Sequence, residues 1–374
     1  MKKYLLVLIL IIGICGYSQS VTTYTNGTPD DAIAIDSNGN IYSSNYTGDA
    51  VFKFSASGDV ISFITGLQSP NGLAFNSAQE LFICDGEAST IYKYDINGNR
   101  LASYSVTGHP SGIIKSRDSE SMIFTIYDTN KLMSLSTDGT ISELNSGTPL
   151  NGPVGLAFDD NDVLYVGNYN DRKIHKVENG SLVYIAQVPQ GTRNFSPYLG
   201  FIAFGKGRLW GTILGSHKIY SIDQNATDSV TLFAGENQGS IDGEISEASF
   251  SQPNGIAFDN SNGNMYITDF ITKNLRVISG IGTLSVKDEL ISEEKMSIYP
   301  NPSLDILNIK MKKYSTSFNS ITINNLLGEI VFSKRFSDVF EVKNININKL
   351  STGIYVVKVI SNNKVLDIQK FVKN

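Results

Sequence analysis

The sequence is poor in the residues that build disulfides and imidazole sites. Its 374 residues include two cysteines and three histidines. Cys15 lies in an apolar run near the start, so removal of that run would leave Cys84 alone and exclude an intramolecular disulfide. Cys84 lies in an apolar strand pattern, which favours a buried structural thiol over a nucleophile. Stability must come from core burial, and a histidine-based site has few options.

Long hydrophobic runs are also missing. The apolar stretch from Leu5 to Ile14 is shorter than the ~20 residues that span a bilayer. Two lysines precede it and small residues follow, which predicts a secretory signal peptide over residues 1–18, cleaved after Ser18. A retained membrane anchor is the alternative. Cys15 would suit a lipoprotein signal, but Ile14 stands where that processing needs a small residue. We expect no transmembrane segment in the mature chain.

Positive charge is scarce in the larger part of the chain. Residues 19–285 carry 15 Lys and Arg against 27 Asp and Glu, a net charge of −12. The remainder to residue 374 carries 13 against 9, a net +4. An acidic domain repels phosphate backbones, so nucleic acid is a poor partner and none is expected.

Helical periodicity is absent as well, and a short repeated phrase takes its place. Six segments share a pattern of small and apolar residues, spaced 40, 40, 43, 46 and 54 residues apart: Ala32–Ile35, Gly72–Phe75, Gly112–Ile114, Gly155–Phe158, Phe201–Phe204 and Gly255–Phe258. This period matches the four short strands of one propeller blade. Six copies therefore predict an all-β, six-bladed β-propeller over residues 19–284.

Each repeat has the same internal order. The small-residue strand comes first, where we expect inner strands to crowd around a channel. A polar turn, an apolar strand and a strand of alternating apolar and polar residues follow. Alternation at period two indicates one buried and one solvent-exposed face. Turns such as Asn97-Gly98 and Asp138-Gly139 then lead into a fourth strand, because both residue pairs accept positive φ.

The last repeat resembles the NHL family most clearly. Phe233–Phe250 and the following Gln252–Asp259 contain the Ala-Gly, Asp-Gly, Ala-x-Phe and Pro-x-Gly-Ile-Ala phrases that its members share. The resemblance covers about residues 21–282 and is weaker in blades three and five. It implies a gluconolactonase-like, six-bladed propeller.

A propeller must join its last blade to its first or leave an open edge. Val21–Thr25 reads as a fourth strand ahead of blade one, and we predict that it completes blade six beside Asn274–Ser279. The competitor for that position is Gly282–Val286.

A different pattern follows the propeller. Residues 285–296 are a charged linker, and five alternating strands then predict a small Ig-like β-sandwich over residues 297–374: Leu304–Met311, Ser320–Asn325, Glu329–Phe336, Tyr355–Ile360 and Val365–Val372. An ordinary adhesive β-sandwich is one interpretation of this unit.

Four short motifs in this segment resemble the C-terminal sorting domain of the type IX secretion system. They are Tyr299-Pro300-Asn301-Pro302, Leu327-Gly328-Glu329, Leu350–Val359 with Gly353 and Tyr355, and the ending Gln369–Lys373 with Lys370 and Lys373. The resemblance implies export by the type IX machinery, with the protein secreted or held on the outer-membrane surface of a Gram-negative bacterium.

The propeller lacks a Gly-x-Ser-x-Gly elbow, a His-Glu-x-x-His pair and a phosphate-binding glycine loop. His175 and His217 lie in or beside third strands, where a structural role is expected, and this argues against the three-histidine zinc lyases among NHL relatives. His109 precedes an inner strand and could face the channel mouth. The loops after second strands carry aromatic residues that could bind a ligand on one rim or pack between blades: Tyr46, Tyr127, Tyr169 and Phe270.

Polar residues also mark two rings near the channel. The first consists of Asp31, Asn71, Ser111, Val154, Gly200 and Asn254. Asp31, Asn71 and Asn254 offer hard oxygen ligands that suit Ca²⁺ or another divalent metal, as in gluconolactonase-like propellers, although turn capping is the simpler interpretation. The second ring is expected to bond neighbouring backbone: Asn45, Asp85, Asn168, Thr212 and Asp269.

Together these features predict an exported, non-catalytic binding module for an extracellular protein, peptide or glycan, with no cofactor expected. The alternative is a metal-dependent lactonase or hydrolase that uses Asp31, Asn71 and Asn254. A purely structural repeat protein is a third interpretation.

Overall fold

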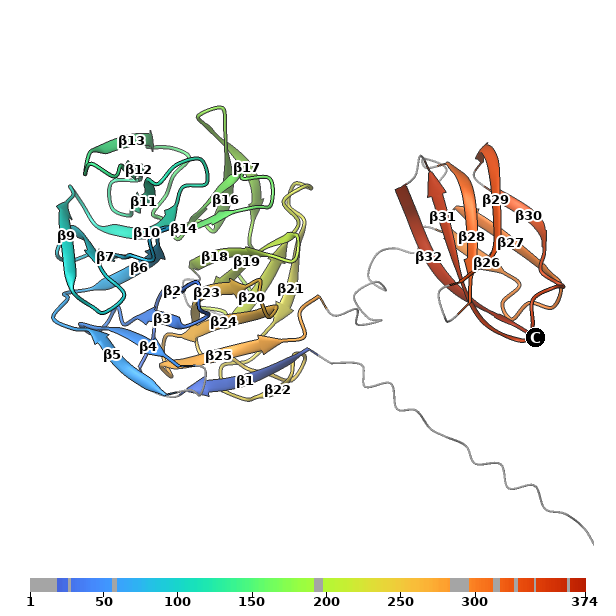
Figure 1. Cartoon of the computed structure of the whole chain (residues 1–374), viewed down its shortest axis with the longest axis horizontal. Helices are drawn as coiled ribbons and strands as arrows, with labels where there is room; N and C mark the ends of the chain where they lie inside the picture. The colour runs from blue at the N-terminus through green and yellow to red at the C-terminus, as the bar shows by residue number, and fades with distance from the viewer. Residues whose placement is uncertain are drawn as a thin grey trace, which may run out of the picture. The chain divides into compact units, whose positions relative to one another are not determined.

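The computed structural model (Figure 1) describes residues 19–25, 28–55, 59–191, 198–282, 296–311, 317–325, 329–339, 341–361 and 364–374. The chain divides into two compact units between residues 283 and 284. The predicted signal peptide and residues 285–295 of the predicted linker lie outside the described residues. No helix in the described part of the chain is long and apolar enough to cross a membrane.

The first unit consists of six antiparallel sheets. In five of them the four strands are consecutive in the sequence, whereas the last sheet is completed by a strand from the start of the chain. Blades one to three are β2 (Ile33–Ile35), β3 (Ile41–Ser44), β4 (Val51–Phe54) and β5 (Val60–Ile64); β6 (Pro70–Phe75), β7 (Leu81–Asp85), β8 (Thr90–Tyr94) and β9 (Arg100–Ser105); and β10 (Pro110–Lys115), β11 (Met122–Ile126), β12 (Lys131–Leu135) and β13 (Ile141–Ser146).

Blades four to six follow the same order. They are β14 (Pro153–Phe158), β15 (Leu164–Asn168), β16 (Lys173–Glu178) and β17 (Ser181–Gln187); β18 (Leu199–Gly205), β19 (Arg208–Ile213), β20 (Lys218–Ile222) and β21 (Val230–Ala234); and β23 (Pro253–Asp259), β24 (Asn264–Asp269), β25 (Asn274–Ser279) and β1 (Ser20–Thr25).

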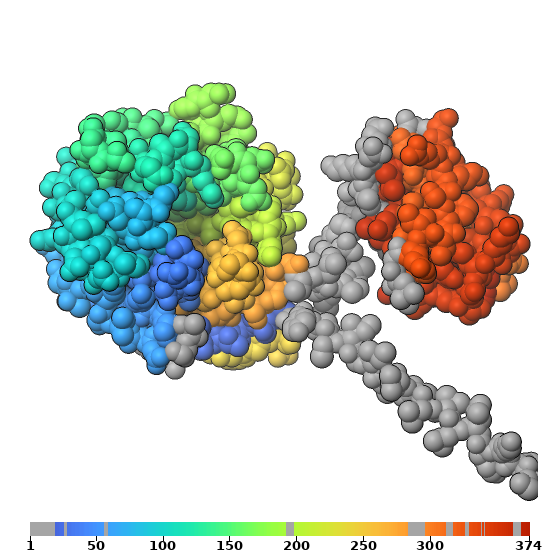
Figure 2. Space-filling model, in the orientation of Figure 1, coloured from blue at the N-terminus to red at the C-terminus, as the bar shows by residue number. Residues whose placement is uncertain are grey.

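The inner strands form a closed ring. Contacts run from β2 to β6, β10, β14, β18 and β23 and return from β23 to β2. The prediction of a six-bladed propeller is therefore confirmed, and Figure 2 shows neighbouring blades in contact side by side.

Glycine is required where inner strands of adjacent blades approach each other. A Cβ atom added at Gly72, Gly112 or Gly255 would lie 2.1, 1.8 or 2.0 Å from a backbone carbonyl oxygen of the next blade. Real Cβ atoms do not approach other atoms so closely, which explains why small residues open the repeated phrase.

Hydroxyl groups near the ends of second strands tie one blade to the next. Ser44 Oγ donates to the carbonyl oxygen of Asn71 at 2.7 Å. Thr212 Oγ1 and Thr268 Oγ1 make the equivalent bonds, at 2.6 Å and 2.7 Å, to the carbonyls of Asn254 in β23 and of Asp31, which precedes β2. These bonds satisfy backbone acceptors that lie in the channel wall beyond the ladders.

The N-terminal strand closes the ring as the sequence predicts. β1 pairs with β25 in antiparallel register, with Val21 opposite Ile278 and Thr23 opposite Arg276. A short strand that the sequence pattern did not indicate, β22 (Gly243–Glu244), adds to the outer side of β1. The predicted competitor for this edge lies outside the described residues from position 283 onward.

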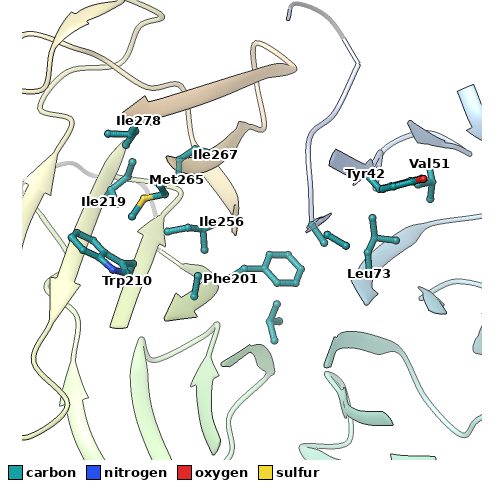
Figure 3. Close-up of a cluster of buried hydrophobic side chains, with 14 of the residues drawn as sticks. Tyr42, Val51, Leu73, Phe201, Trp210, Ile219, Ile256, Met265, Ile267 and Ile278 are labelled. Atoms are coloured by element: carbon teal, nitrogen blue, oxygen red, sulfur yellow. The ribbon is translucent and has the colours of Figure 1, made fainter. Parts of the chain in front are cut away.

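The largest buried apolar cluster of the propeller includes residues from blades one, two, five and six, and Figure 3 shows several of them. Trp210, the chain's single tryptophan, is buried in blade five. Its ring packs edge-to-face on Phe233 at 4.7 Å between centroids, and its Nε1 donates to the carbonyl of Gly205 at 2.9 Å. Trp210 is therefore a natural fluorescent reporter of propeller unfolding.

The second unit is a β-sandwich, as predicted. One sheet holds β26 (Met296–Tyr299), β27 (Ile306–Met311) and β30 (Glu341–Asn346), and the other holds β29 (Ile330–Val339), β28 (Phe318–Asn324), β31 (Gly353–Ser361) and β32 (Lys364–Lys373). Leu307 and Ile309 of the first sheet and Ile323 and Val357 of the second belong to one fully buried cluster. The sequence pattern did not indicate β26 and β30, which are short or carry polar residues.

Candidate functional site

The main candidate site is a pocket of about 680 Å³ in one mouth of the propeller channel. The structure brings together in its wall all eight residues that the sequence singled out for ligand or metal binding: Asp31, Tyr46, Asn71, His109, Tyr127, Tyr169, Asn254 and Phe270. The aromatic residues follow second strands, whose ends lie at this mouth, and the polar ones lie on or beside inner strands.

Aromatic rings form a continuous arc along one side of the pocket. Ring centroids lie 6.3 Å apart between Tyr46 and His109, and 6.4 Å apart between His109 and Tyr127. Tyr127 and Tyr169 meet at 5.9 Å and 84°, and Tyr169 stacks on Tyr198 at 4.4 Å and 9°. These rings are half-buried, so each both packs between blades and faces the pocket.

His109 is held where blades two and three meet. Its backbone N–H donates to Asp128 Oδ1 at 2.9 Å. A Cβ atom at Gly86 would lie 2.0 Å from His109 Nε2, so only glycine leaves room for the imidazole in its present position. The imidazole is thus placed in the pocket wall by two neighbouring loops.

The pocket floor carries buried polar atoms without partners. Asn254 Nδ2 donates to Asp31 Oδ1 at 2.5 Å, and Asn71 Nδ2 donates to Ser111 Oγ at 3.2 Å. Asp31 and Asn71 are only 3% and 7% exposed, yet Asp31 Oδ2 and Asn71 Oδ1 have no hydrogen-bond partner among the described residues. Unpaired buried acceptors are costly, so each calls for an explanation.

Burial raises the pKa of Asp31 well above its ordinary value, and the neighbouring Asp30 carboxylate raises it further. The bond from Asn254 and the nearby Lys273 ammonium act in the opposite direction but are outweighed. An ionised Asp31 in the empty pocket is therefore an unfavourable state.

This shift has a measurable consequence for stability. Because the folded pKa of Asp31 lies above the unfolded value of ~3.9, its contribution to stability is fully present below ~pH 4 and declines as pH rises toward the folded pKa. We expect Asp31→Asn to remove that decline and raise the melting temperature at pH 8 by ~2 °C or more, with little effect at pH 4. Thermal melts followed by Trp210 fluorescence test this. Asp160→Asn, an exposed matched control, should change neither value, and a lower melting temperature of Asp31→Asn at pH 8 would contradict the prediction.

Four of the five residues of the second polar ring bond neighbouring backbone, as the sequence indicated, whereas Asn45 accepts the hydroxyl of Thr47 at 3.2 Å. Asp85 accepts the backbone N–H groups of Gln68 and Ser69 at 2.9 and 2.8 Å. Asn168 Nδ2 donates to the carbonyl of Pro149 at 2.8 Å. Asp269 accepts the N–H of Ser251 at 2.9 Å, and burial raises its pKa to about 6.

The other two histidines lie away from the pocket wall. His175 is 3% exposed, and burial lowers the pKa of its imidazole. His217 Nδ1 accepts the backbone N–H of Gln252 at 3.0 Å and thereby holds the loop before β23. Both positions agree with the structural roles expected from the sequence.

The oxygen set of the floor does not complete a divalent-metal site. Within the described residues no group of three His, Cys, Asp or Glu side chains could hold a metal ion. Asp31 is the single carboxylate of the set, and the amide nitrogens of Asn71 and Asn254 are bonded to protein oxygens. Ca²⁺ takes about six to eight oxygen ligands, so these residues do not fit it and no reaction step through a metal follows.

Sequence reasoning missed part of the pocket wall. Tyr198, Leu214 and Gln252 lie in connections outside the repeated phrase, and Asp128 follows Tyr127 in its loop. Repeat position could have found these residues. Leu214 and Asp128 follow second strands, and Tyr198 and Gln252 stand where His109 does, each carbonyl accepting a backbone N–H from the loop after the second strand.

The C-terminal unit gathers its motifs at one end of the sandwich. Asn301 Oδ1 accepts the N–H of Val372 at 2.9 Å, and Tyr299 Oη donates to Glu341 at 2.6 Å. The adjacent Pro300 and Pro302 are exposed. The loop Tyr299–Pro302 is thus tied to the C-terminal strand β32.

The motif Leu350–Val359 contacts β32 as well, and the motif Gln369–Lys373 is part of that strand. Gly353 lies opposite Lys373, and Tyr355 stacks on Phe371 at 5.6 Å and 24°. Tyr355 Oη donates to the carbonyl of Ser351 at 2.8 Å. Lys373 is 7% exposed, and Lys370 is exposed on the opposite side of β32. Leu327 and Gly328 of the remaining motif lie outside the described residues.

Fold and site define the class of protein: a six-bladed β-propeller with a ligand-sized pocket in its channel mouth, followed by a β-sandwich. Comparison with known families identifies the second unit, because residues 297–374 match the secretion system C-terminal sorting domain. The chain therefore carries a type IX sorting domain, which indicates secretion or attachment at the cell surface. No curated protein matches the chain.

Several solved structures are similar to the propeller. An auxiliary nutrient binding protein from Bacteroides ovatus is 17% identical, with a TM-score of 0.59, over 70% of this chain and 77% of that one. A gluconolactonase from Xanthomonas campestris is 18% identical, with a TM-score of 0.53, over 70% and 89%. A streptogramin B lyase is 15% identical, with a TM-score of 0.52, over 71% and 98%.

At such identities the likeness shows the fold alone. It confirms the predicted six-bladed propeller fold, and the sorting-domain match confirms the second predicted resemblance. The assignment of the individual repeats to the NHL family stays a prediction.

Proposed function

We propose that this chain is an exported binding protein that holds a chemical group of an extracellular protein, peptide or glycan in the channel-mouth pocket. The observation that carries the proposal is the combination of an aromatic arc with two buried, unpartnered oxygens in one pocket. Ligand pockets commonly pair apolar and aromatic walls with a few polar groups that orient the ligand.

The surroundings support a binding role. The arc consists of rings that neighbouring loops hold in place, so little conformational entropy would be lost when a ligand binds. The sorting domain indicates secretion or attachment at the cell surface, which agrees with an extracellular ligand. Proteins described as nutrient binding share the fold, which agrees with the proposal.

The test is a glycan array and a peptide library probed with the mature chain, residues 19–374. We expect Tyr169→Ala to weaken binding of any captured ligand by about tenfold or more, because aromatic residues at the centre of a pocket dominate binding energy. Tyr184→Ala, on the outer strand of the same blade, is the matched control and should bind as the wild type does. Equal binding by both variants would place the ligand elsewhere and refute the proposal.

The alternative function, that of a metal-dependent hydrolase, has less support. Asp31 is the single carboxylate among the floor oxygens, and the described donor set does not fit the metal. Melting of the mature chain with Ca²⁺ and with EDTA tests it. An unchanged melting temperature in both would eliminate this candidate.

A further inference from the structure

The pocket has a one-sided charge distribution. Among its described lining residues, Asp31 and Asp128 carry formal negative charge, and none is a lysine or an arginine. Lys273, whose charge acts on Asp31 from outside the wall, pairs with the Asp30 carboxylate. An anionic ligand would therefore face two carboxylates with no compensating charge.

The floor offers two acceptor oxygens that have no partner in the described part of the chain. Asp31 and Asn71 line the pocket, and their Oδ2 and Oδ1 atoms are buried with no hydrogen-bond partner among the described residues. A carboxylate and an amide oxygen can only accept, so a ligand must supply the N–H or O–H groups. A primary ammonium group supplies three N–H donors and a positive charge at one atom.

The aromatic wall of the pocket also favours a primary ammonium group. A cation is attracted to the face of a tyrosine or phenylalanine ring within about 6 Å, and more strongly once water is displaced. Tyr127 and Tyr169 lie at 84° to each other and so present faces in two directions. Phe270 already accepts a cation, with Lys273 Nζ 5.0 Å from its ring centroid.

From these observations we propose that the pocket recognises a primary ammonium group, with its nitrogen at Asp31 Oδ2 and Asn71 Oδ1 and its alkyl carbons against the tyrosine rings. The inference rests on the proposed binding function and names the chemistry of the ligand. A hydroxyl group could also donate, but it supplies one hydrogen and no charge, whereas an ammonium group supplies three hydrogens and the positive charge that stabilises the ionised form of Asp31.

Binding should depend on pH in a defined direction. The charged and titratable groups around Asp31 are Asp30, Lys273, Tyr46 and Tyr169. Because burial and Asp30 favour the protonated form of Asp31, an ammonium ligand must displace a proton from it. Affinity should therefore fall as pH is lowered from 8 to 5, while the ligand itself stays charged.

The experiment is calorimetric titration of the mature chain with matched pairs of probes. Nα-acetyl-lysine methylamide and its Nε-acetyl form test a peptide source, and glucosamine and N-acetylglucosamine test a sugar source. We expect the charged member of at least one pair to bind about tenfold or more tightly than its acetylated counterpart, the loss expected when a charged hydrogen bond is removed. The pair that shows this difference identifies the source.

Variants separate this inference from the proposed function. Asp31→Asn keeps the shape of the side chain and an acceptor for Asn254, and it should abolish the preference for the charged probe. Asp160→Asn removes the same charge on an exposed turn and should keep the preference. Equal binding of both members of each pair, or no binding of either charged probe, would overturn the inference. Tyr169-dependent capture of another ligand in the arrays would leave the proposed function standing.

Discussion

Deletion of residues 297–374 is expected to leave the propeller in the periplasm, with at least tenfold less protein outside the cell than for the full chain. These residues match the secretion system C-terminal sorting domain and form a unit with its own buried core. The propeller core is separate from that unit, so its folding does not require the deleted residues. Fractionation of cells that carry this secretion system, with antibodies against the propeller, measures the effect.

A milder change tests whether the folded end of the sandwich is what the machinery reads. Asn301→Ala removes the acceptor of the Val372 N–H and should reduce export while the propeller remains folded. Tyr169→Ala, in the propeller pocket, is the control and should be exported normally. Full export of the deleted chain would show that residues 297–374 are an ordinary β-sandwich rather than a sorting signal.

The propeller could be predicted from sequence because its constraints recur. Each blade needs a small residue where inner strands approach, and Gly72, Gly112 and Gly255 meet that need at equivalent positions. The count of six follows from the number of copies. Closure by Val21–Thr25 follows because a strand-like segment ahead of the first copy has one open edge to fill.

Features that occur once were harder to predict. β22 is two residues long and carries no alternation, so the sequence gives no strand signal there. Tyr198 belongs to an irregular connection, so its stacking on Tyr169 depends on tertiary structure. The bond between Asn254 and Asp31 joins residues at opposite ends of the propeller sequence and needs the closed ring.

Arg276 should be the most sensitive charged residue of the propeller. Its side chain is fully buried in β25, beside the closing strand β1. Nη1 donates to Asp269 Oδ2 at 3.2 Å and to the carbonyl of Ser249 at 2.9 Å. Nη2 donates to Asp242 Oδ1 at 2.7 Å and to the carbonyl of Ile241 at 3.0 Å.

The same network fastens the closing strand. Asp242 also accepts the backbone N–H and the hydroxyl of Thr23 in β1, each at 2.9 Å. Partial burial raises the pKa of Asp242, but the bonds from Thr23 and the pairing with Arg276 outweigh it and lower the pKa below its ordinary value. One arginine therefore joins β24, β25 and the loop that holds β1.

We expect Arg276→Ala to lower the free energy of unfolding at pH 7.5 by about 3–5 kcal/mol, because it leaves Asp269 buried without its counter-charge. Arg276→Lys keeps the positive charge but cannot donate from two nitrogens to two partners. Its free energy of unfolding should therefore lie between those of the wild type and Arg276→Ala. Urea unfolding of the mature chain, followed by Trp210 fluorescence, measures these values.

The pH dependence of this decrease in the free energy of unfolding identifies its cause. Burial already raises the pKa of Asp269 to about 6 with Arg276 present, and removal of the arginine raises it further. Below that pKa the carboxyl is protonated and needs no partner, so the deficit of Arg276→Ala should be smaller at pH 5 than at pH 7.5. Arg208→Ala, at an exposed position, should stay within about 0.5 kcal/mol of the wild type at both values. If Arg276→Ala lowers the free energy of unfolding by less than ~1 kcal/mol, backbone pairing of β1 with β25 closes the ring without the buried charges. If the decrease is equal at both pH values, the effect comes from packing against Phe250.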